Sequence, residues 1–184
     1  HGLANAARGF AAADGLALVE FDGAAQLRRG GWNGPVLMLE GAFEPADVEQ
    51  AARDGLSLVV HEARQLEWLE ALSAPAGIGV FLKFNSGMNR LGFRRDAFRD
   101  AFARLSRLPS VRQVTLMTHF ANADLAGGAD EALARFRAAA DGLAAPRSLA
   151  NSAATLLLPG THGASIRPGV LLYGIFNFLP LLGL

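Results

Sequence analysis

Short apolar runs of strand length alternate with helix-length segments along this chain, and this alternation limits its fold more than any other feature. Each run is nearly continuous in apolar residues rather than alternating with polar ones. A strand that is apolar on both faces is typical of a parallel sheet covered by helices, and not of a hairpin. The sequence therefore predicts an α/β fold of successive βα units, with strands over 16–21, 35–39, 56–60, 79–84, 114–117 and 148–150.

Between these runs, apolar residues recur at helical spacing. The clearest case is 96–108, where Phe98, Phe102 and Leu105 share one face and arginines lie opposite. Further helices are expected over 2–13, 22–29, 44–53, 62–72 and 130–140. An open doubly wound sheet would have the same rhythm, but the units are short, evenly spaced and without a Gly-rich dinucleotide loop, which favours a TIM-type (β/α)8 barrel. We count about seven strands, one fewer than such a barrel needs.

Composition excludes several classes of function. The 184 residues are 51% hydrophobic and 18% charged, which is enough apolar material for a sizeable core. A formal net charge of +0 argues against a nucleic-acid partner. The absence of cysteine excludes disulfides and fits a reducing, cytoplasmic compartment, and the four scattered histidines suggest no metal site. The apolar tail 175–184 is too short to cross a bilayer, so we expect no membrane partner.

One stretch, FLKFNSGMNRLGF at 81–93, gathers polar groups at the point where an apolar strand ends. It holds Lys83, the single lysine among 17 Lys and Arg residues. Arginine keeps its proton in proteins, whereas lysine can be neutral, nucleophilic or covalently modified. A chemical role for Lys83 therefore stands beside the plainer possibility that it pairs with a nearby carboxylate inside the fold.

The segment KFNSGMNRLGF also resembles the central signature of bacterial alanine racemases, the fold-type III enzymes that use pyridoxal 5'-phosphate. Three further segments resemble the same family in the same order: LMTHFA at 116–121, SLANSAA at 148–154 and IRPGVLLYG at 166–174. The resemblance extends from His1-Gly2 to about residue 174. It implies a pyridoxal phosphate-binding barrel domain over 1–174, followed at 175–184 by a truncated apolar tail where a second, mainly β domain would begin.

The resemblance also implies roles for individual residues. His119 would stack on the pyridine ring of the cofactor, and Arg90 would face the substrate carboxylate. The remaining cofactor contacts would come from Asn151, Ser152, Arg167, Gly169 and Val170. The residues alone allow plainer roles for three of these positions: a satisfied core histidine at 119, a helix cap at 151–152 and a surface ion pair at Arg167.

By resemblance, Arg167 faces the pyridine nitrogen, where many other cofactor enzymes place a carboxylate. Arginine keeps its proton, so it cannot protonate that nitrogen. The ring should then be a weaker electron sink, which limits side reactions such as transamination. Lys83 matches a family lysine that is often carbamylated and whose negative charge orients the arginine matching Arg90.

The catalytic bases of the family are expected to be absent from this chain. The Schiff-base lysine belongs to a K-A-x-A-Y-G-H-G context, of which His1-Gly2 matches only the end. The missing first strand should therefore precede His1. The opposing base is a tyrosine of the second domain, whereas Tyr173, the only tyrosine, falls in the expected last strand of the barrel. We expect this fragment to be inactive by itself.

The complete enzyme would then be a cytoplasmic homodimer that interconverts L- and D-alanine through a pyridoxal phosphate aldimine by a two-base mechanism. It would supply D-alanine for peptidoglycan or degrade it. Two alternatives stay open: a racemase of the same fold with broader amino-acid specificity, and a non-catalytic single-domain barrel that binds pyridoxal phosphate.

Overall fold

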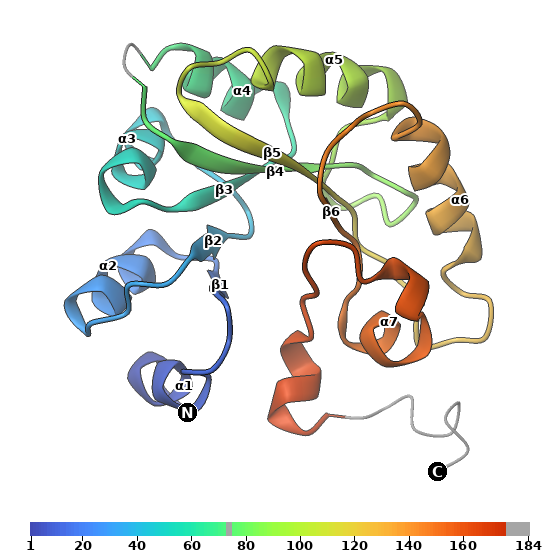
Figure 1. The fold of residues 1–184 in the computed structure, drawn as a ribbon, viewed down its shortest axis with the longest axis horizontal. Helices are drawn as coiled ribbons and strands as arrows, with labels where there is room; N and C mark the ends of the chain where they lie inside the picture. The colour runs from blue at the N-terminus through green and yellow to red at the C-terminus, as the bar shows by residue number, and fades with distance from the viewer. Residues whose placement is uncertain (73–74, 176–184) are drawn as a thin grey trace. The chain divides into compact units, whose positions relative to one another are not determined.

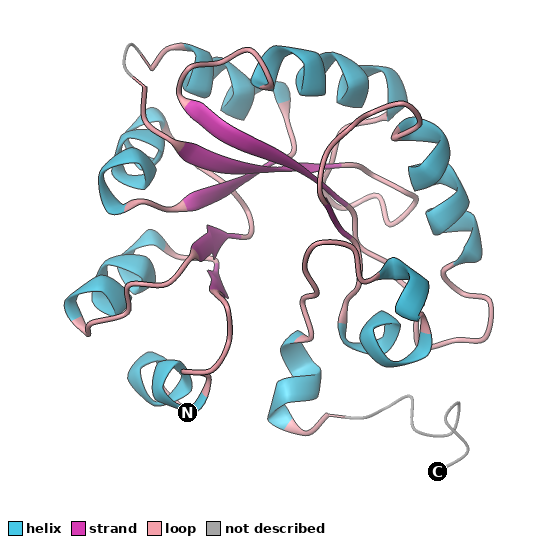
Figure 2. Ribbon diagram, viewed as in Figure 1, coloured by secondary structure: helices cyan, strands magenta, loops and turns pink. Residues whose placement is uncertain are grey.

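The computed structural model describes residues 1–72 and 75–175, and it confirms the α/β class (Figures 1 and 2). Six strands are each followed by a helix. The strands are β1 (Leu16–Leu18), β2 (Val36–Met38), β3 (Ser57–Val60), β4 (Ile78–Lys83), β5 (Val111–Met117) and β6 (Arg147–Ser148). The helices are α1 (Leu3–Gly9), α2 (Phe21–Arg29), α3 (Pro45–Asp54), α4 (Ala63–Glu70), α5 (Arg95–Leu105), α6 (Asp130–Ala139) and α7 (Ser152–Leu157). Two short 3-10 helices follow, η1 (Pro159–Thr161) and η2 (Gly169–Tyr173).

The strands form one sheet in sequence order, β1-β2-β3-β4-β5-β6. The pairs β1–β2, β2–β3 and β5–β6 are parallel, with Leu16 opposite Val36, Leu37 opposite Ser57 and Leu116 opposite Arg147. Parallel neighbours joined through helices place all strand carboxyl ends, and the loops that follow them, at the same edge of a sheet.

The expectation that Tyr173 lies in the last strand of the barrel is wrong, because Tyr173 belongs to the 3-10 helix η2. Pro168 precedes η2 and has no N–H to donate to a strand ladder, and Gly174 ends η2 in a left-handed conformation. Tyr173 therefore lies in η2 and is 49% exposed. The described residues hold six strands rather than about seven. Of the tail 175–184, only Ile175 lies within them.

The chain divides into two compact units, and β4 and β5 each contribute residues to both. The first unit comprises His1–Phe81 and Ala103–Val114. Its α3 begins and ends as its capping signals predict, with Pro45 in the first turn, Asp47 accepting the Glu44 N–H at 3.2 Å and Gly55 left-handed at the end. Helix α1 stops at Gly9, short of the expected 13, because glycine is a poor helix former.

Buried side chains of the first unit come mainly from β2, β3, the start of β4 and one face each of α2, α3 and α4. An ion pair on its surface joins Arg104 to Glu70 through two hydrogen bonds, from Nε at 2.9 Å and from Nη2 at 2.8 Å. This pairing holds the pKa of the Glu70 carboxyl below its usual range. Among the described residues, every helix is too short or too polar to span a bilayer.

The second unit begins at Leu82 in β4 and contains the ends of β4 and β5, β6 and everything after it that the structure describes. Its core is aromatic. The Phe84 ring lies 5.2 Å from the Phe98 ring and 6.3 Å from the Phe136 ring, between centroids. Phe98 of α5 and Phe136 of α6 are fully buried, on the apolar face that the helical spacing predicts for each helix.

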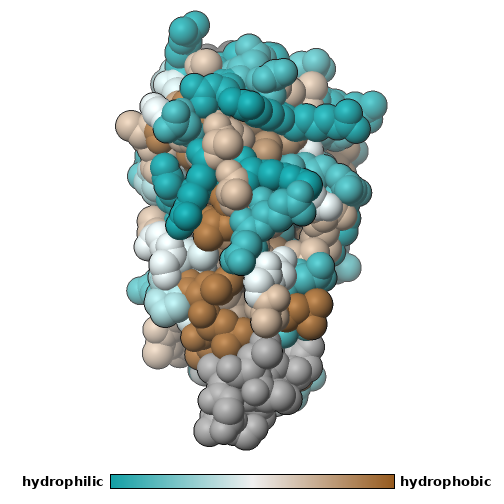
Figure 3. Space-filling view, turned by 90° about the vertical axis from the view of Figure 1, so that its right-hand side faces the viewer, coloured by the Kyte–Doolittle hydropathy of each residue, from teal (hydrophilic) through white to brown (hydrophobic). Residues whose placement is uncertain are grey.

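Exposed apolar side chains concentrate near the end of the described chain, at Leu156, Ile166, Val170, Leu172, Tyr173 and Ile175. On the face drawn in Figure 3, apolar residues likewise gather next to the grey atoms. The apolar residues of η2 therefore do not enter the core of the second unit.

Candidate functional site

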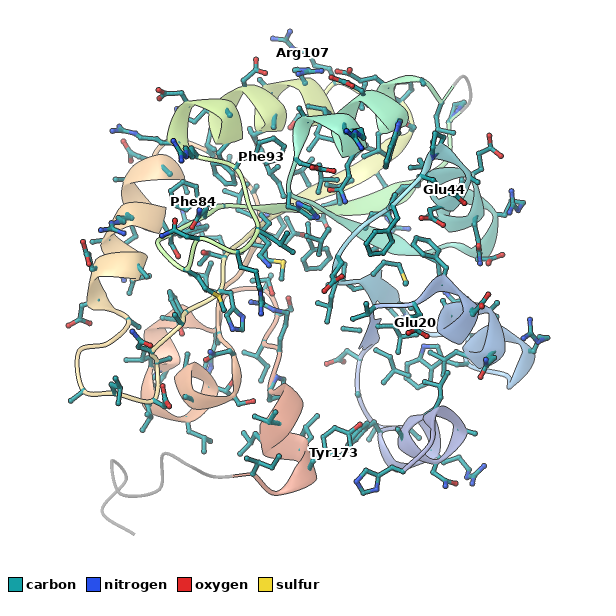
Figure 4. All side chains as sticks on the ribbon, turned by 180° about the vertical axis from the view of Figure 1, so that it is seen from behind. Glu20, Glu44, Phe84, Phe93, Arg107 and Tyr173 are labelled. Carbon is teal, nitrogen blue, oxygen red and sulfur yellow. The ribbon has the colours of Figure 1, made fainter. Side chains whose placement is uncertain are left out.

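The loop after β4 is closed on itself by backbone pairing. Asn85 N–H donates to the Phe93 carbonyl and Phe93 N–H donates to the Lys83 carbonyl, both at 2.9 Å. Phe84 and Phe93 thus form a parallel bridge on either side of the loop (Figure 4). Gly92 makes this closure possible: it has φ of 121°, and a Cβ there would lie 2.7 Å from the Asn85 nitrogen.

Asn85 organises the inside of this loop. Its Oδ1 accepts hydrogen bonds from the N–H groups of Gly87 at 3.0 Å and Asn89 at 3.1 Å, and its Nδ2 donates to Asn89 Oδ1 at 3.1 Å. Asn89 adopts a left-handed φ of 58°, which asparagine tolerates better than most residues. The result is a turn that presents Met88 and Arg90 at an exposed tip.

A small hollow brings three of the predicted site residues together. Lys83 at the end of β4, Arg90 on the loop and His119 just after β5 all line it. Lys83 is buried, with 6% of its surface exposed, whereas Arg90 is exposed. Asn151, Ser152, Arg167, Gly169 and Val170 do not line this hollow.

His119 is a neutral imidazole at physiological pH. Burial, followed by the positive charges of Arg167, Lys83 and Arg90, lowers its pKa to about 4. Within the described residues its ring has no hydrogen-bond partner, so the expectation of a core histidine satisfied by a partner is not met. The three cations that act on His119 make its surroundings electropositive.

Arg167 is held by neutral oxygens. Its Nη2 donates to the Thr118 carbonyl at 2.7 Å and to the Leu149 carbonyl at 3.4 Å, and its Nη1 donates to Ser148 Oγ. No carboxylate pairs with it in the described part of the chain, which rules out the surface ion pair as its role there. Burial lowers the pKa of the guanidinium to about 10, so it stays charged at neutral pH.

Asn151 caps α7. Its Oδ1 accepts the Ala154 N–H at 3.1 Å, and its Nδ2 donates to the Phe120 carbonyl at 2.9 Å. Capping therefore accounts for this side chain, which is the plainer of the two roles that the sequence allows at position 151. Ser152 is different, because its buried Oγ accepts the Leu171 N–H of η2 at 3.2 Å. This contact brings Ser152 to the helix that begins with Gly169 and Val170.

Sequence reasoning missed two hydroxyls that hold the site residues. Ser148 accepts from Arg167, and Thr118 connects the end of β5 to Phe84 and Ser86. Each lies inside a segment that sequence analysis singled out, LMTHFA and SLANSAA. Their contacts span 19 to 34 residues of chain, which a local pattern does not reveal.

The polar groups of the site limit which ligands it can bind. In the described ranges, no group of three or more His, Asp or Glu side chains is placed to hold a metal ion. Guanidinium groups, backbone N–H groups at a helix start and hydroxyls are instead the groups that bind phosphate and carboxylate anions. The donor set of the second unit therefore suits an anionic ligand.

Comparison with known proteins identifies the family. Residues 1–176 match the family described as "Alanine racemase, N-terminal domain". The chain is 47% identical over 174 residues to the alanine racemase of Sodalis glossinidius, covering 95% of this chain and 49% of the relative. It is 47% identical over 178 residues to that of a Janthinobacterium species, with 95% and 50% covered.

Solved structures agree. The crystal structure of the biosynthetic alanine racemase from Pseudomonas aeruginosa matches with a TM-score of 0.88 and 38% identity, over 95% of this chain and 49% of that one. The alanine racemase from Acinetobacter baumannii matches with a TM-score of 0.85 and 29% identity, over 95% and 50%. The chain spans about half the length of the relatives it matches. With its parallel βα units, it has the expected TIM-barrel-type fold, and it belongs to the alanine racemase family through that family's N-terminal domain.

Proposed function

We propose that this chain is the cofactor-binding part of an alanine racemase that uses pyridoxal 5'-phosphate. Family membership supplies the reaction class, a racemase and thus an isomerase. The observation that carries the cofactor assignment is the setting of His119, a neutral ring on which three cations act. A flat, neutral imidazole can stack on a pyridine ring, and the surrounding positive charges suit a ligand with anionic groups.

The phosphate would be bound where Ser152 meets η2. The Ser152 hydroxyl lies beside the first turn of this helix, as its bond from Leu171 N–H shows. The N–H groups of Gly169 and Val170 belong to that first turn, where no helical carbonyl can accept them. A hydroxyl and two unpaired N–H groups are the donors that a phosphate needs. In this proposal Asn151 acts one step away, by capping α7.

Arg167 would face the ring nitrogen. When bound, pyridoxal phosphate would supply the electron sink that makes the Cα proton of alanine acidic enough to remove. The Arg167 guanidinium, with a pKa of about 10, does not hand over its proton at neutral pH. The sink is then weaker than in an enzyme with a carboxylate at this position, and proton return to Cα is favoured over transamination.

Arg90 would bind the carboxylate of alanine. It lies at the tip of the Asn85-organised loop, in the same hollow as His119, and no carboxylate of the described residues pairs with it. Lys83 would orient it as a carbamate. The Lys83 ammonium first loses one proton to water. The neutral Nζ then attacks the carbon of carbon dioxide, an N–C bond forms and a second proton leaves to water, so that a cation next to Arg90 becomes an anion. Arginine at position 83 could not react in this way.

We assign neither Lys83 nor Tyr173 as one of the two bases that racemisation needs. A racemase needs a base on each face of Cα. Lys83 is committed to Arg90 in this proposal, and Tyr173 is an exposed residue of η2. The two bases would come from residues outside these 184, in a cytoplasmic homodimer that contains the whole enzyme. The 184-residue chain alone would not racemise alanine.

The test is a titration of the 184-residue chain with pyridoxal phosphate, and in parallel with pyridoxal, which lacks the phosphate. We expect reversible binding that is about tenfold tighter for the phosphorylated ligand, corresponding to about 1.4 kcal/mol. Ser152→Ala should remove that difference, and Arg167→Gln should weaken both ligands. Arg107→Gln is the matched control, because Arg107 points away from the fold (Figure 4).

Two results would contradict the proposal. One is the absence of saturable binding of pyridoxal phosphate to the unmodified chain. The other is a borohydride-reduced adduct on Lys83 in a peptide map, which would show that the single lysine forms the covalent bond to the cofactor. The carbamate has its own readout: carbon dioxide trapped on Lys83 adds the mass of one CO₂, about 44 Da, to its peptide, and Lys83→Arg should abolish it.

A further inference from the structure

Two buried hydroxyls join the loop after β4 to the end of β5. Ser86 Oγ lies 2.8 Å from Thr118 Oγ1, and Thr118 Oγ1 donates to the Phe84 carbonyl at 2.9 Å. Ser86 is 3% exposed and Thr118 is 0% exposed. A buried hydroxyl is costly unless it is paired, so this contact satisfies two polar groups that water does not reach.

The direction of these hydrogen bonds is fixed. Thr118 has a single hydroxyl proton, and the Phe84 carbonyl can only accept it. Thr118 Oγ1 therefore accepts from Ser86, and the Ser86 proton points at Thr118. The hydroxyl of Ser86 thus donates to Thr118 Oγ1, and the hydroxyl of Thr118 donates to the Phe84 carbonyl.

The chain of hydrogen bonds lies between the parts of the candidate site. Ser86 is the buried member of the loop tip, whose next four residues, from Gly87 to Arg90, are all exposed. Thr118 directly precedes His119, and its carbonyl accepts the Nη2–H of Arg167 at 2.7 Å. The two hydroxyls thus connect the loop of Arg90 to the residue that borders both His119 and Arg167.

We propose that the Ser86–Thr118 hydroxyl pair is a positioning element, which sets where Arg90 lies relative to His119 and Arg167. The proposal rests on the proposed function of those three residues, and neither hydroxyl is assigned a contact with substrate or cofactor. The Asn85 side chain shapes the turn internally, but its hydrogen bonds stay within 85–89. The Asn85 backbone N–H donates to the Phe93 carbonyl, which closes the base of the loop and leaves its tip unanchored. The weak contact from Arg135 Nη1 to the Ser86 carbonyl, at 3.4 Å, adds little to this anchoring.

The pair predicts an asymmetry between its two members. Ser86→Ala removes one donor and leaves Thr118 bonded to the Phe84 carbonyl, so only the loop loses its anchor. Thr118→Val leaves the Ser86 hydroxyl and the Phe84 carbonyl both unpaired in a buried site, so it should perturb the loop and the strand end together. Thr118→Ser keeps the hydroxyl and should rescue both.

The experiment compares these three variants of the 184-residue chain with Thr155→Val as control. Thr155 is also a hydroxyl of the second unit that donates to a backbone carbonyl, that of Asn151 at 2.7 Å, but it is remote in sequence from the loop. The first readout is amide hydrogen exchange at 87–90. The second is the protonation of the His119 imidazole at pH 6, by nitrogen NMR, because a loop that opens exposes the ring and moves its charged neighbour Arg90.

We expect exchange at 87–90 to rise about tenfold in Ser86→Ala and in Thr118→Val, and His119 to become partly protonated at pH 6 in both. Thr118→Ser and Thr155→Val should match the parent chain. Pyridoxal phosphate affinity should fall in Thr118→Val, through Arg167, and stay within about twofold in Ser86→Ala. If Thr118→Val does not fold, Ser86→Ala and Thr118→Ser still decide the question.

Loop exchange and His119 protonation that are the same in Ser86→Ala as in Thr155→Val would overturn the proposal, because the pair would then only add stability. A parent chain that binds no pyridoxal phosphate would overturn the proposed function instead. The exchange measurement does not depend on the ligand, so the two failures are distinguishable.

Discussion

The Arg167 guanidinium donates from Nη2 to the carbonyl oxygen of Thr118 at 2.7 Å, so a charged side chain of the candidate site is held by the backbone next to His119. Its other acceptors, Ser148 Oγ and the Leu149 carbonyl, are neutral too. Neutral acceptors satisfy the N–H groups of a guanidinium without cancelling its charge. The charge therefore acts on His119 and lowers its pKa together with burial.

Arg167→Gln should destabilise the chain by roughly 2–3 kcal/mol, because it leaves partly buried acceptors without a donor. Urea unfolding at pH 7.5 measures this as a lower midpoint with an unchanged slope. Arg107→Gln, at an exposed side chain with no partner in the described residues, should stay within about 0.5 kcal/mol of the parent. Equal stability of the two variants would show that the Arg167 hydrogen bonds contribute nothing net.

His119 makes stability depend on pH. Its folded pKa of about 4 lies below the ordinary value of 6.5, so between these values the unfolded chain binds more protons than the folded one. The contribution of neutral His119 to the free energy of unfolding should therefore be complete above about pH 6.5 and should be lost as the pH drops toward 4.

The size of this effect follows from the shift. One pKa unit corresponds to about 1.4 kcal/mol, and with allowance for the partial exposure of the ring the loss by pH 4 should be roughly 2 kcal/mol. His119→Gln removes the titrating group, so its unfolding free energy should vary less between pH 6.5 and pH 5 than that of the parent. Parallel curves for the two proteins would mean that the imidazole is not buried in the folded state.

Gly92→Ala should open the loop after β4. The left-handed φ of 121° is unfavourable for alanine, and the new Cβ would lie 2.7 Å from the Asn85 nitrogen and 2.9 Å from the Phe84 carbonyl carbon. We expect a loss of roughly 2–4 kcal/mol and loss of protection of the Asn85 and Phe93 amides in hydrogen exchange. Gly160→Ala is the matched control, because a Cβ at that position would meet nothing within 4 Å and the φ of Gly160 is not left-handed.

Local chemistry explains which parts of the fold could be predicted. The sequence predicts helix α3 to within a residue because Pro45 and Gly55 mark its ends directly. Strand β5, in contrast, starts at Val111 rather than at the predicted 114, because its first residues pair through the backbone while Arg112 and Gln113 are exposed. Hydrophobic pattern reports burial of side chains and not backbone pairing.

The candidate site divides in the same way. Lys83 and His119 could be found because they lie at the ends of apolar strands, and Arg90 because its segment resembles the family signature. The structure places all three in one hollow. The Ser86–Thr118 contact joins positions 32 residues apart and leaves no periodic trace in the sequence. The expectation of a last barrel strand at Tyr173 is wrong because such a strand requires its apolar residues to be buried, whereas Val170 and Leu172 are about half exposed at 49% and 50%.

Asn151 offers a final test, because the structure gives its side chain two separate tasks. Oδ1 caps α7 through the Ala154 N–H, and Nδ2 donates to the Phe120 carbonyl. Asn151→Ala loses both and should cost about 1–2 kcal/mol in urea unfolding. Asn151→Asp keeps the cap but places a carboxylate oxygen against the Phe120 carbonyl, so it should be destabilised at pH 7 and recover part of the loss at pH 4, where a protonated carboxyl can donate. An Asp variant as stable as the parent at pH 7 would show that the bond to Phe120 does not hold the start of α7 in place.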